Sequence, residues 1–105
     1  MKNYVVNLAG VTFDGRQKEI CSLPENSPLY LWQYSVQQDP NCVAVCTVTG
    51  RIMGFIPKMY SSFVKGLVEA KKAKVVSWKK VGGFAQYATV GLQLIIGEEE
   101  ASDVS

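Results

Sequence analysis

The sequence has no histidine and only three cysteines. Without histidine the chain cannot build a Ser-His-Asp triad, a Cys-His dyad or a histidine-ligated metal site. The odd number of cysteines fits a reducing compartment better than a disulfide framework. Cys42 and Cys46 would lie too far apart along one strand to share a disulfide or a metal. We therefore interpret Cys21, Cys42 and Cys46 as small buried residues.

Long hydrophobic runs are also missing. No apolar run approaches the roughly 20 residues that span a bilayer, and the first residues lack the apolar core of a secretory signal. The chain has no Gly-Lys-Ser/Thr phosphate-binding loop and no recognisable motif of paired carboxylates. We therefore expect a cytoplasmic, non-enzymatic protein that needs no cofactor and contacts no membrane.

The 105 residues do contain enough apolar sequence for one core, since 48% are hydrophobic and 19% are charged. This composition is typical of a globular protein, and the length fits one domain. We expect a single domain over residues 1–97, followed by an acidic, flexible tail over residues 98–105.

The net charge of +2 is unevenly distributed along the chain. Residues 51–80 carry eight lysine and arginine side chains against one glutamate. Such a concentration is typical of a surface that binds phosphate, and it predicts that Arg51, Lys58 and part of the lysines in 71–80 line one surface. Lysines that solvate a helix end and protect an edge strand would explain the same pattern.

The spacing of apolar residues changes along the chain, which predicts both strands and helices. Alternation predicts strands at residues 2–9, 29–34, 42–48, 51–56, 73–81 and 84–96. Helical spacing predicts a main helix at 59–70 and a shorter one at 15–22. We expect Ser61 or Ser62 to cap the main helix, and Gly66 to mark its close packing against the sheet.

Thr49 and Gly50 separate two of these strands at the spacing of a tight hairpin, with the glycine at positive φ. The strands have no crossover helices between parallel partners, which favours antiparallel pairing. The sequence therefore predicts a mainly β fold, a small OB-like antiparallel β-barrel with one or two short helices.

Three segments resemble the motifs of the HIRAN domain family, in the form of its stand-alone bacterial members. They are GVTFDGRQ at residues 10–17, DPNCVAV at residues 39–45 and GRIMGFIPK at residues 50–58. Their order and spacing also match, and the resemblance covers about residues 4–96. It implies a β-barrel related to the OB fold and binding of DNA, in the best-understood relatives at a single-stranded 3′ end. Because eukaryotic members sit on fork-remodelling helicases, it also implies a helicase or nuclease partner.

The resemblance assigns a role to three residues. Phe13 falls where the family has an aromatic side chain that stacks on a base. Asp39 falls on an aspartate that accepts a hydrogen bond from the terminal sugar hydroxyl. Lys58 falls on a basic residue that contacts phosphate.

Arg16, Asn41 and Arg51 complete the predicted nucleic-acid-binding set, and no metal site is predicted. Several members have a structural alternative. Arg16 could cover the end of the barrel rather than contact phosphate. Asp39 and Asn41 could bond only their own backbone in a turn, and Lys58 could be an ordinary lysine at a strand end.

The sequence departs from the family just before the second motif and within the third. Gln38 replaces a second stacking aromatic, and Phe55 stands where the helicase relatives carry a histidine. We therefore expect only a small preference for 3′ ends. Tyr34 could substitute for the lost aromatic or belong to the core, whereas we interpret Trp32 and Trp78 as core or rim packing.

Two functions from different classes follow. The leading one is a non-catalytic nucleic-acid-binding module for single-stranded DNA or DNA 3′ ends. The alternative is a protein-interaction module or homo-oligomerising domain without DNA-binding activity, with a barrel edge or an aromatic patch as its interface. DNA binding that weakens as salt rises would support the nucleic-acid-binding module. Self-association that depends on protein concentration would support the interaction module.

Overall fold

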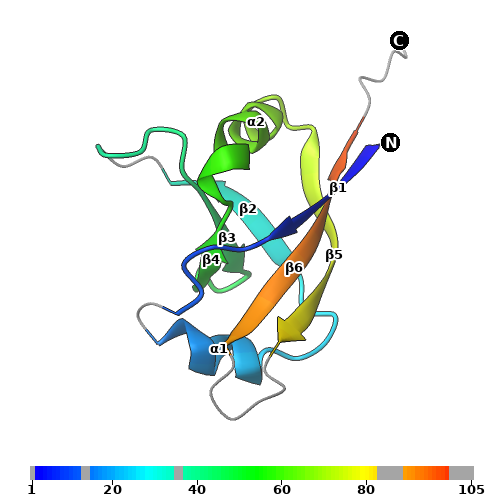
Figure 1. Cartoon of the computed structure of the whole chain (residues 1–105). Helices are drawn as coiled ribbons and strands as arrows, with labels where there is room; N and C mark the ends of the chain where they lie inside the picture. Colours follow the sequence, from blue (N-terminus) through cyan, green and yellow to red (C-terminus); the bar gives the residue numbers. More distant parts are fainter. Residues whose placement is uncertain (1, 13–14, 35–36, 83–88, 100–105) are drawn as a thin grey trace.

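The computed structural model describes residues 2–12, 15–34, 37–82 and 89–99, and this part of the chain is mainly β (Figure 1). In chain order the elements are β1 (Lys2–Asn7), α1 (Arg16–Ser22), β2 (Leu29–Gln33), β3 (Val43–Thr47), β4 (Ile52–Phe55), α2 (Lys58–Glu69), β5 (Ala73–Gly82) and β6 (Val90–Glu98). The predicted order of strands and helices is confirmed. No helix in the described ranges is long and apolar enough to cross a membrane.

The described strands pair into two antiparallel sheets of three strands each. Sheet A has the order β1-β6-β5, and sheet B has the order β2-β3-β4. One residue pair joins them: Ala9, just after β1, and Phe55, at the end of β4, each donate a backbone N–H to the other's carbonyl. The two N···O distances are 2.8 and 2.9 Å, so β4 is tied to both sheets.

The opposite edges of the two sheets, β2 and β5, lie next to each other without a hydrogen-bonded ladder between their described residues. The Trp78 indole crosses this gap by donating to the Ser27 carbonyl at 2.7 Å. Trp78 also packs against the core, as the sequence predicts. The described strands thus form two sheets around one core and do not close into the predicted barrel.

The core lies between the sheets, with α1 covering one end and α2 the other (Figure 1). Its largest fully buried side chains come from both sheets and from α1: Ile20, Met53, Leu92, Leu94, Ile96, Val43 and Val45. The alternation of Leu92, Leu94 and Ile96 along β6 was predicted, and all three are fully buried.

The last strand differs from its predicted bounds at both ends. β6 begins at Val90, and residues 84–88 of the predicted strand lie outside the described part of the chain. At its other end β6 continues to Glu98, and the Glu99 N–H donates to the Lys72 carbonyl at 2.7 Å. The folded domain therefore extends beyond residue 97, because pairing with both neighbouring strands continues through Glu98.

The hairpin between β3 and β4 forms as predicted. Gly50 adopts a φ of +87°, a conformation that L side chains rarely take. Its N–H donates to the Thr47 carbonyl at 2.9 Å, and the Thr47 N–H donates to the Arg51 carbonyl at 3.0 Å. This is the geometry of a three-residue hairpin loop that ends in a left-handed glycine.

The helix α2 is present, but its cap and its buried face differ from the prediction. It begins at Lys58 with Pro57 as N-cap residue and no side-chain cap. Ser61 instead lies buried inside the first turn, where its hydroxyl donates to the Lys58 carbonyl at 3.1 Å. Gly66 is exposed, and a Cβ there would meet no atom within 4 Å. The expected close packing at Gly66 is therefore wrong, because α2 turns Val64 toward the core instead.

The short helix α1 is fixed to the beginning of β6 by Gln17. Its Nε2 donates to the carbonyls of Val11 at 2.9 Å and Val90 at 2.8 Å, and its Oε1 accepts from the Val90 N–H at 2.9 Å. The side-chain amide thus pairs with Val90 as a neighbouring strand would. Ile20, one turn later, is fully buried and anchors the helix in the core.

Candidate nucleic-acid interface

Asp39 and Asn41 form a turn in the loop before β3. The Asn41 N–H donates to Asp39 Oδ1 at 3.1 Å, and the Cys42 N–H donates to the Asp39 carbonyl at 3.2 Å. Asp39 thus bonds the backbone of its own turn, and a role of Asp39 and Asn41 in binding nucleic acid stays a prediction. An ionised carboxylate has about four acceptor positions, so the half-buried Asp39 side chain can accept from a further donor.

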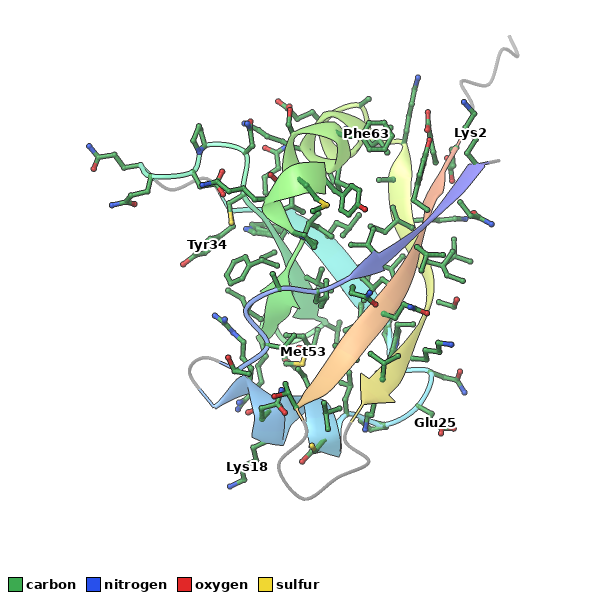
Figure 2. All side chains as sticks on the ribbon, in the orientation of Figure 1. Lys2, Lys18, Glu25, Tyr34, Met53 and Phe63 are labelled. Atoms are coloured by element: carbon green, nitrogen blue, oxygen red, sulfur yellow. The ribbon has the colours of Figure 1, made fainter. Side chains whose placement is uncertain are left out.

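Phe55, at the end of β4, is in contact with two other side chains. The Arg16 guanidinium carbon lies 4.9 Å from the Phe55 ring centroid, and the Tyr34 ring centroid lies 5.7 Å away at an interplanar angle of 54°. Tyr34 is 42% exposed and projects outward from the end of β2 (Figure 2), so it does not belong to the core. We call Arg16, Tyr34 and Phe55 the Phe55 cluster.

Arg16 is held in this cluster by a backbone contact as well as by the ring. Its Nη1 donates to the Gly10 carbonyl at 2.7 Å, which fits the covering role considered for this side chain. Gly10 has a φ of +68°, and a Cβ there would lie 3.2 Å from Phe55 Cδ2. Glycine at this position therefore lets the guanidinium settle on the Phe55 face, a cation–π arrangement.

Backbone pairing and one lysine bring the Asp39 turn next to the cluster. The Tyr34 N–H donates to the Cys42 carbonyl at 2.8 Å. Lys65 Nζ donates to the Pro40 carbonyl at 2.7 Å and so ties the loop to α2. Lys58 precedes Lys65 by seven residues, close to two helical turns, so both lie on the same face of α2, roughly 10 Å apart. We did not predict Lys65, although this spacing is visible in the sequence.

Arg51 lies apart from these residues. Its guanidinium pairs with the Glu19 carboxylate of α1, and 65% of its side chain is exposed. Residues 51–57 run in a largely extended segment from Arg51 to the beginning of α2, so Arg51 and Lys58 are separated by roughly 20 Å. Arg51 therefore does not join Asp39 and Lys58 in one small pocket.

Of the lysines in residues 71–80, Lys74, Lys79 and Lys80 lie on β5, whereas Lys71 and Lys72 precede it. Lys74 lies near its beginning, 3.8 Å from the Glu99 carboxylate. Lys80 lies near its end, where Nζ donates to the Cys21 carbonyl of α1 at 3.0 Å. An extended strand separates these two lysines by roughly 20 Å. That Arg51, Lys58 and part of these lysines line one surface stays a prediction. The cation shown in contact with the Phe55 ring is Arg16.

Phe13 lies outside the described residues, and its stacking role stays a prediction. In the sequence, Phe55 was noted as a departure from the family and Tyr34 as a possible substitute for the lost aromatic, but their contact was not predicted. The one feature of the sequence that could have suggested the contact is the aromatic residue at position 55 in place of the family's histidine. The structure thus brings together Arg16, Tyr34, Asp39 and Phe55 near the beginning of α2.

The cysteines provide a test of the charge at the Asp39 turn. Cys21 is exposed, contrary to the interpretation of all three as buried, whereas Cys42 and Cys46 are half-buried. Burial raises the pKa of the Cys42 thiol, and the nearby Asp39 carboxylate raises it further; burial alone raises the pKa of Cys46. A reagent reaches the exposed Cys21 thiol more easily than the two half-buried thiols.

We expect Cys21 to react first with a thiol reagent near pH 8, ahead of Cys42 and Cys46. Asp39→Asn removes the carboxylate charge and so lowers the pKa of Cys42, which should speed modification of that residue while leaving Cys46 unchanged. Mass spectrometry of the labelled peptides measures the three rates separately. An unchanged Cys42 rate in Asp39→Asn would contradict the proximity of this carboxylate to the thiol.

Comparisons with known proteins add no assignment. No protein-family model, no curated protein and no solved structure matches this chain. The residues of the chain itself are therefore the basis for assigning a function.

Proposed function

We propose that the chain is a non-catalytic module that binds single-stranded DNA and receives its 3′ end at the Phe55 cluster and the Asp39 turn. One observation carries this proposal: the Arg16 guanidinium and the Tyr34 ring, from distant parts of the sequence, both contact the Phe55 ring, and the Tyr34 N–H pairs with Cys42 at the end of the Asp39 turn. These residues lie within or next to the segments that resemble the HIRAN family. On this proposal the two sheets correspond to an open, OB-like barrel.

The chemistry of the cluster suits a strand end. The ring of Tyr34 is exposed and offers a face to a base, an interaction worth about 1–3 kcal/mol whatever the base. Lys58 and Lys65 supply point charges for phosphate, and Arg16 supplies a delocalised cation that Phe55 already positions. Asp39 would accept from a free 3′ hydroxyl, a donor that a nucleotide inside a strand lacks.

One observation favours the alternative, self-association or protein binding. Met59, Tyr60 and Phe63 are exposed on α2, and Phe63 contacts Tyr4 with ring centroids 5.0 Å apart. A groove of about 330 Å³ separates this part of α2 from β1, with Val5 exposed beside it. Exposed apolar groups gathered in this way are common at protein interfaces.

We expect labelled single strands to bind at low salt and to weaken as salt rises, with a slope of about −0.7 for each phosphate contacted. Lys58→Ala should weaken binding of all sequences and reduce that slope by about 0.7, whereas Lys79→Ala on β5 serves as a matched control with little effect. Asp39→Ala should weaken binding of a strand with a 3′ hydroxyl and leave a 3′-phosphorylated strand unchanged. Fluorescence anisotropy titrations at two salt concentrations measure these differences.

Failure has two distinguishable forms. Equal binding of the hydroxyl and phosphate ends by the unmodified protein would leave a general single-strand binder without an end pocket. If the folded protein binds neither strand at low salt, the DNA-binding proposal is wrong. Sedimentation of the same sample at increasing concentration then tests self-association.

A further inference from the structure

The outer face of sheet B carries a groove of about 650 Å³ that the end-binding role does not use. Aromatic side chains of β2 line one side of it and the β3-β4 hairpin lines the other. The main side chains are Tyr30, Trp32, Tyr34, Cys46, Val48 and Ile52. None of the described residues that line the groove is acidic.

Three aromatic rings follow one another along this groove. Tyr30, Trp32 and Tyr34 occupy every second position, and 50%, 64% and 42% of their surfaces are exposed, whereas Leu31 between the first two packs against the core. The expectation that Trp32 packs in the core or at its rim is therefore wrong. Two-residue steps along a strand place the rings roughly 7 Å apart, about twice the 3.4 Å between stacked bases of a duplex. This spacing suits a single strand whose bases have separated and stack on protein rings instead.

The groove is continuous with the Phe55 cluster, because Tyr34 belongs to both. The Tyr34 ring faces the groove and also lies 5.7 Å from the Phe55 ring. At the far end the groove reaches Gly50, which precedes Arg51, whose side chain is mostly exposed even while it pairs with Glu19. The row of aromatic side chains thus runs from Tyr34, which links it to Phe55 and Arg16, to the hairpin residue that precedes the ion pair of Arg51 with Glu19.

We propose that the groove on sheet B is the path of the nucleotides on the 5′ side of the strand end. Their bases stack on Tyr34, Trp32 and Tyr30 in turn, and the phosphates run toward Arg51. The inference rests on the proposed function and extends it, from a pocket for one end to a site for several nucleotides of single-stranded DNA. Arg51 then joins the interface as the sequence predicted, although at the far end of the strand rather than beside Asp39.

A second copy of the chain fits the groove less well than a nucleic acid. In a two-fold contact the same surface meets itself, so Arg16 and Arg51 of one copy would face the same cations of the other. Like charges brought together across an interface oppose association, whereas a polyanion satisfies both ends at once.

Trp32 makes this path measurable, because the chain has only two tryptophans and Trp78 lies on β5 of sheet A, where it packs against the core and donates to the Ser27 carbonyl. We expect an oligothymidylate of eight nucleotides to quench Trp32 emission, and one of two nucleotides, held at the Phe55 cluster, to leave it nearly unchanged. Trp32→Leu should abolish the quenching and weaken binding of the longer strand by about 5- to 150-fold. Binding of the shorter strand should stay within about twofold.

Tyr30→Leu tests the next ring in the row, and Tyr60→Leu, a tyrosine of similar exposure on α2, is the matched control. All three side chains are exposed, so the variants should keep the unfolding midpoint of the parent, which is checked first. Equal binding of the longer strand by Trp32→Leu and the parent would overturn the path while leaving the end-binding function intact. No binding of either strand would overturn both. A concentration-dependent blue shift of Trp32 emission without DNA, together with a dimer in sedimentation, would assign the groove to a second copy instead.

Discussion

Ile20→Ala lowers the free energy of unfolding by about 2–5 kcal/mol, the range for truncating a fully buried aliphatic side chain. The side chain has no exposed surface and forms the anchor of α1 in the core. An isolated helix of seven residues is not stable in water, so α1 depends on its packing. Truncating Ile20 should therefore also weaken the hydrogen bonds between Gln17 and β6. Small domains have a total stability of only about 5–15 kcal/mol, so the effect is a large fraction of the whole.

Two further substitutions in α1 serve as controls for the loss of stability expected in Ile20→Ala. Ile20→Val removes one methylene and should cost about 0.5–1.5 kcal/mol, while Cys21→Ala, at an exposed position, should stay within about 0.5 kcal/mol. Urea denaturation followed by circular dichroism gives the three values. If Ile20→Ala costs no more than Ile20→Val, α1 is not anchored through this side chain.

Gly54→Ala should destabilise the protein by about 1–3 kcal/mol. A Cβ at this position would lie 2.9 Å from the Ala9 carbonyl oxygen and 3.1 Å from Leu8 Cβ. Relief requires moving the backbone of the segment that follows β1, and that segment makes the Ala9–Phe55 pair between the sheets. The substitution therefore acts on the connection between the sheets rather than on one side chain.

Gly66→Ala is the matched control for the same chemical change. No atom lies within 4 Å of the added methyl, and the residue is inside α2, where alanine is favoured over glycine by about 0.5–1 kcal/mol. The two variants should thus shift the urea midpoint in opposite directions. A stabilised Gly54→Ala would show that the approach of Ala9 to Gly54 is looser than described.

Local patterns were sufficient to predict most of the elements. The change of period near Met59 and the left-handed glycine at residue 50 depend on neighbours a few residues away, and both predictions are confirmed. The roles of Ser61 and Gly66 could not be predicted in the same way. They depend on how α2 rotates against the sheets, which no local pattern determines.

The candidate site was predicted only in pieces. The turn at Asp39 is a local feature and was considered from the sequence. The contacts of Arg16 and Tyr34 with Phe55 exist only once the chain is folded. Trp32 was misplaced because tryptophans are usually well buried, whereas here its neighbour Leu31 takes the inward position on the strand.

The pairing of β1 with β6 makes the first strand the last to find its partner during synthesis. Lys2 is in register with Glu98, and the Tyr4 hydroxyl donates to Glu98 Oε1 at 2.8 Å across a separation of 94 residues. Sheet B needs only residues 29–55 and can form as soon as they have left the ribosome. Until β6 emerges, the backbone N–H and C=O groups of β1 have no strand partner and its apolar side is uncovered. The strand can then pair with other chains. Because contacts between residues far apart in the sequence form slowly, we expect the pairing of β1 with β6 to form later than sheet B.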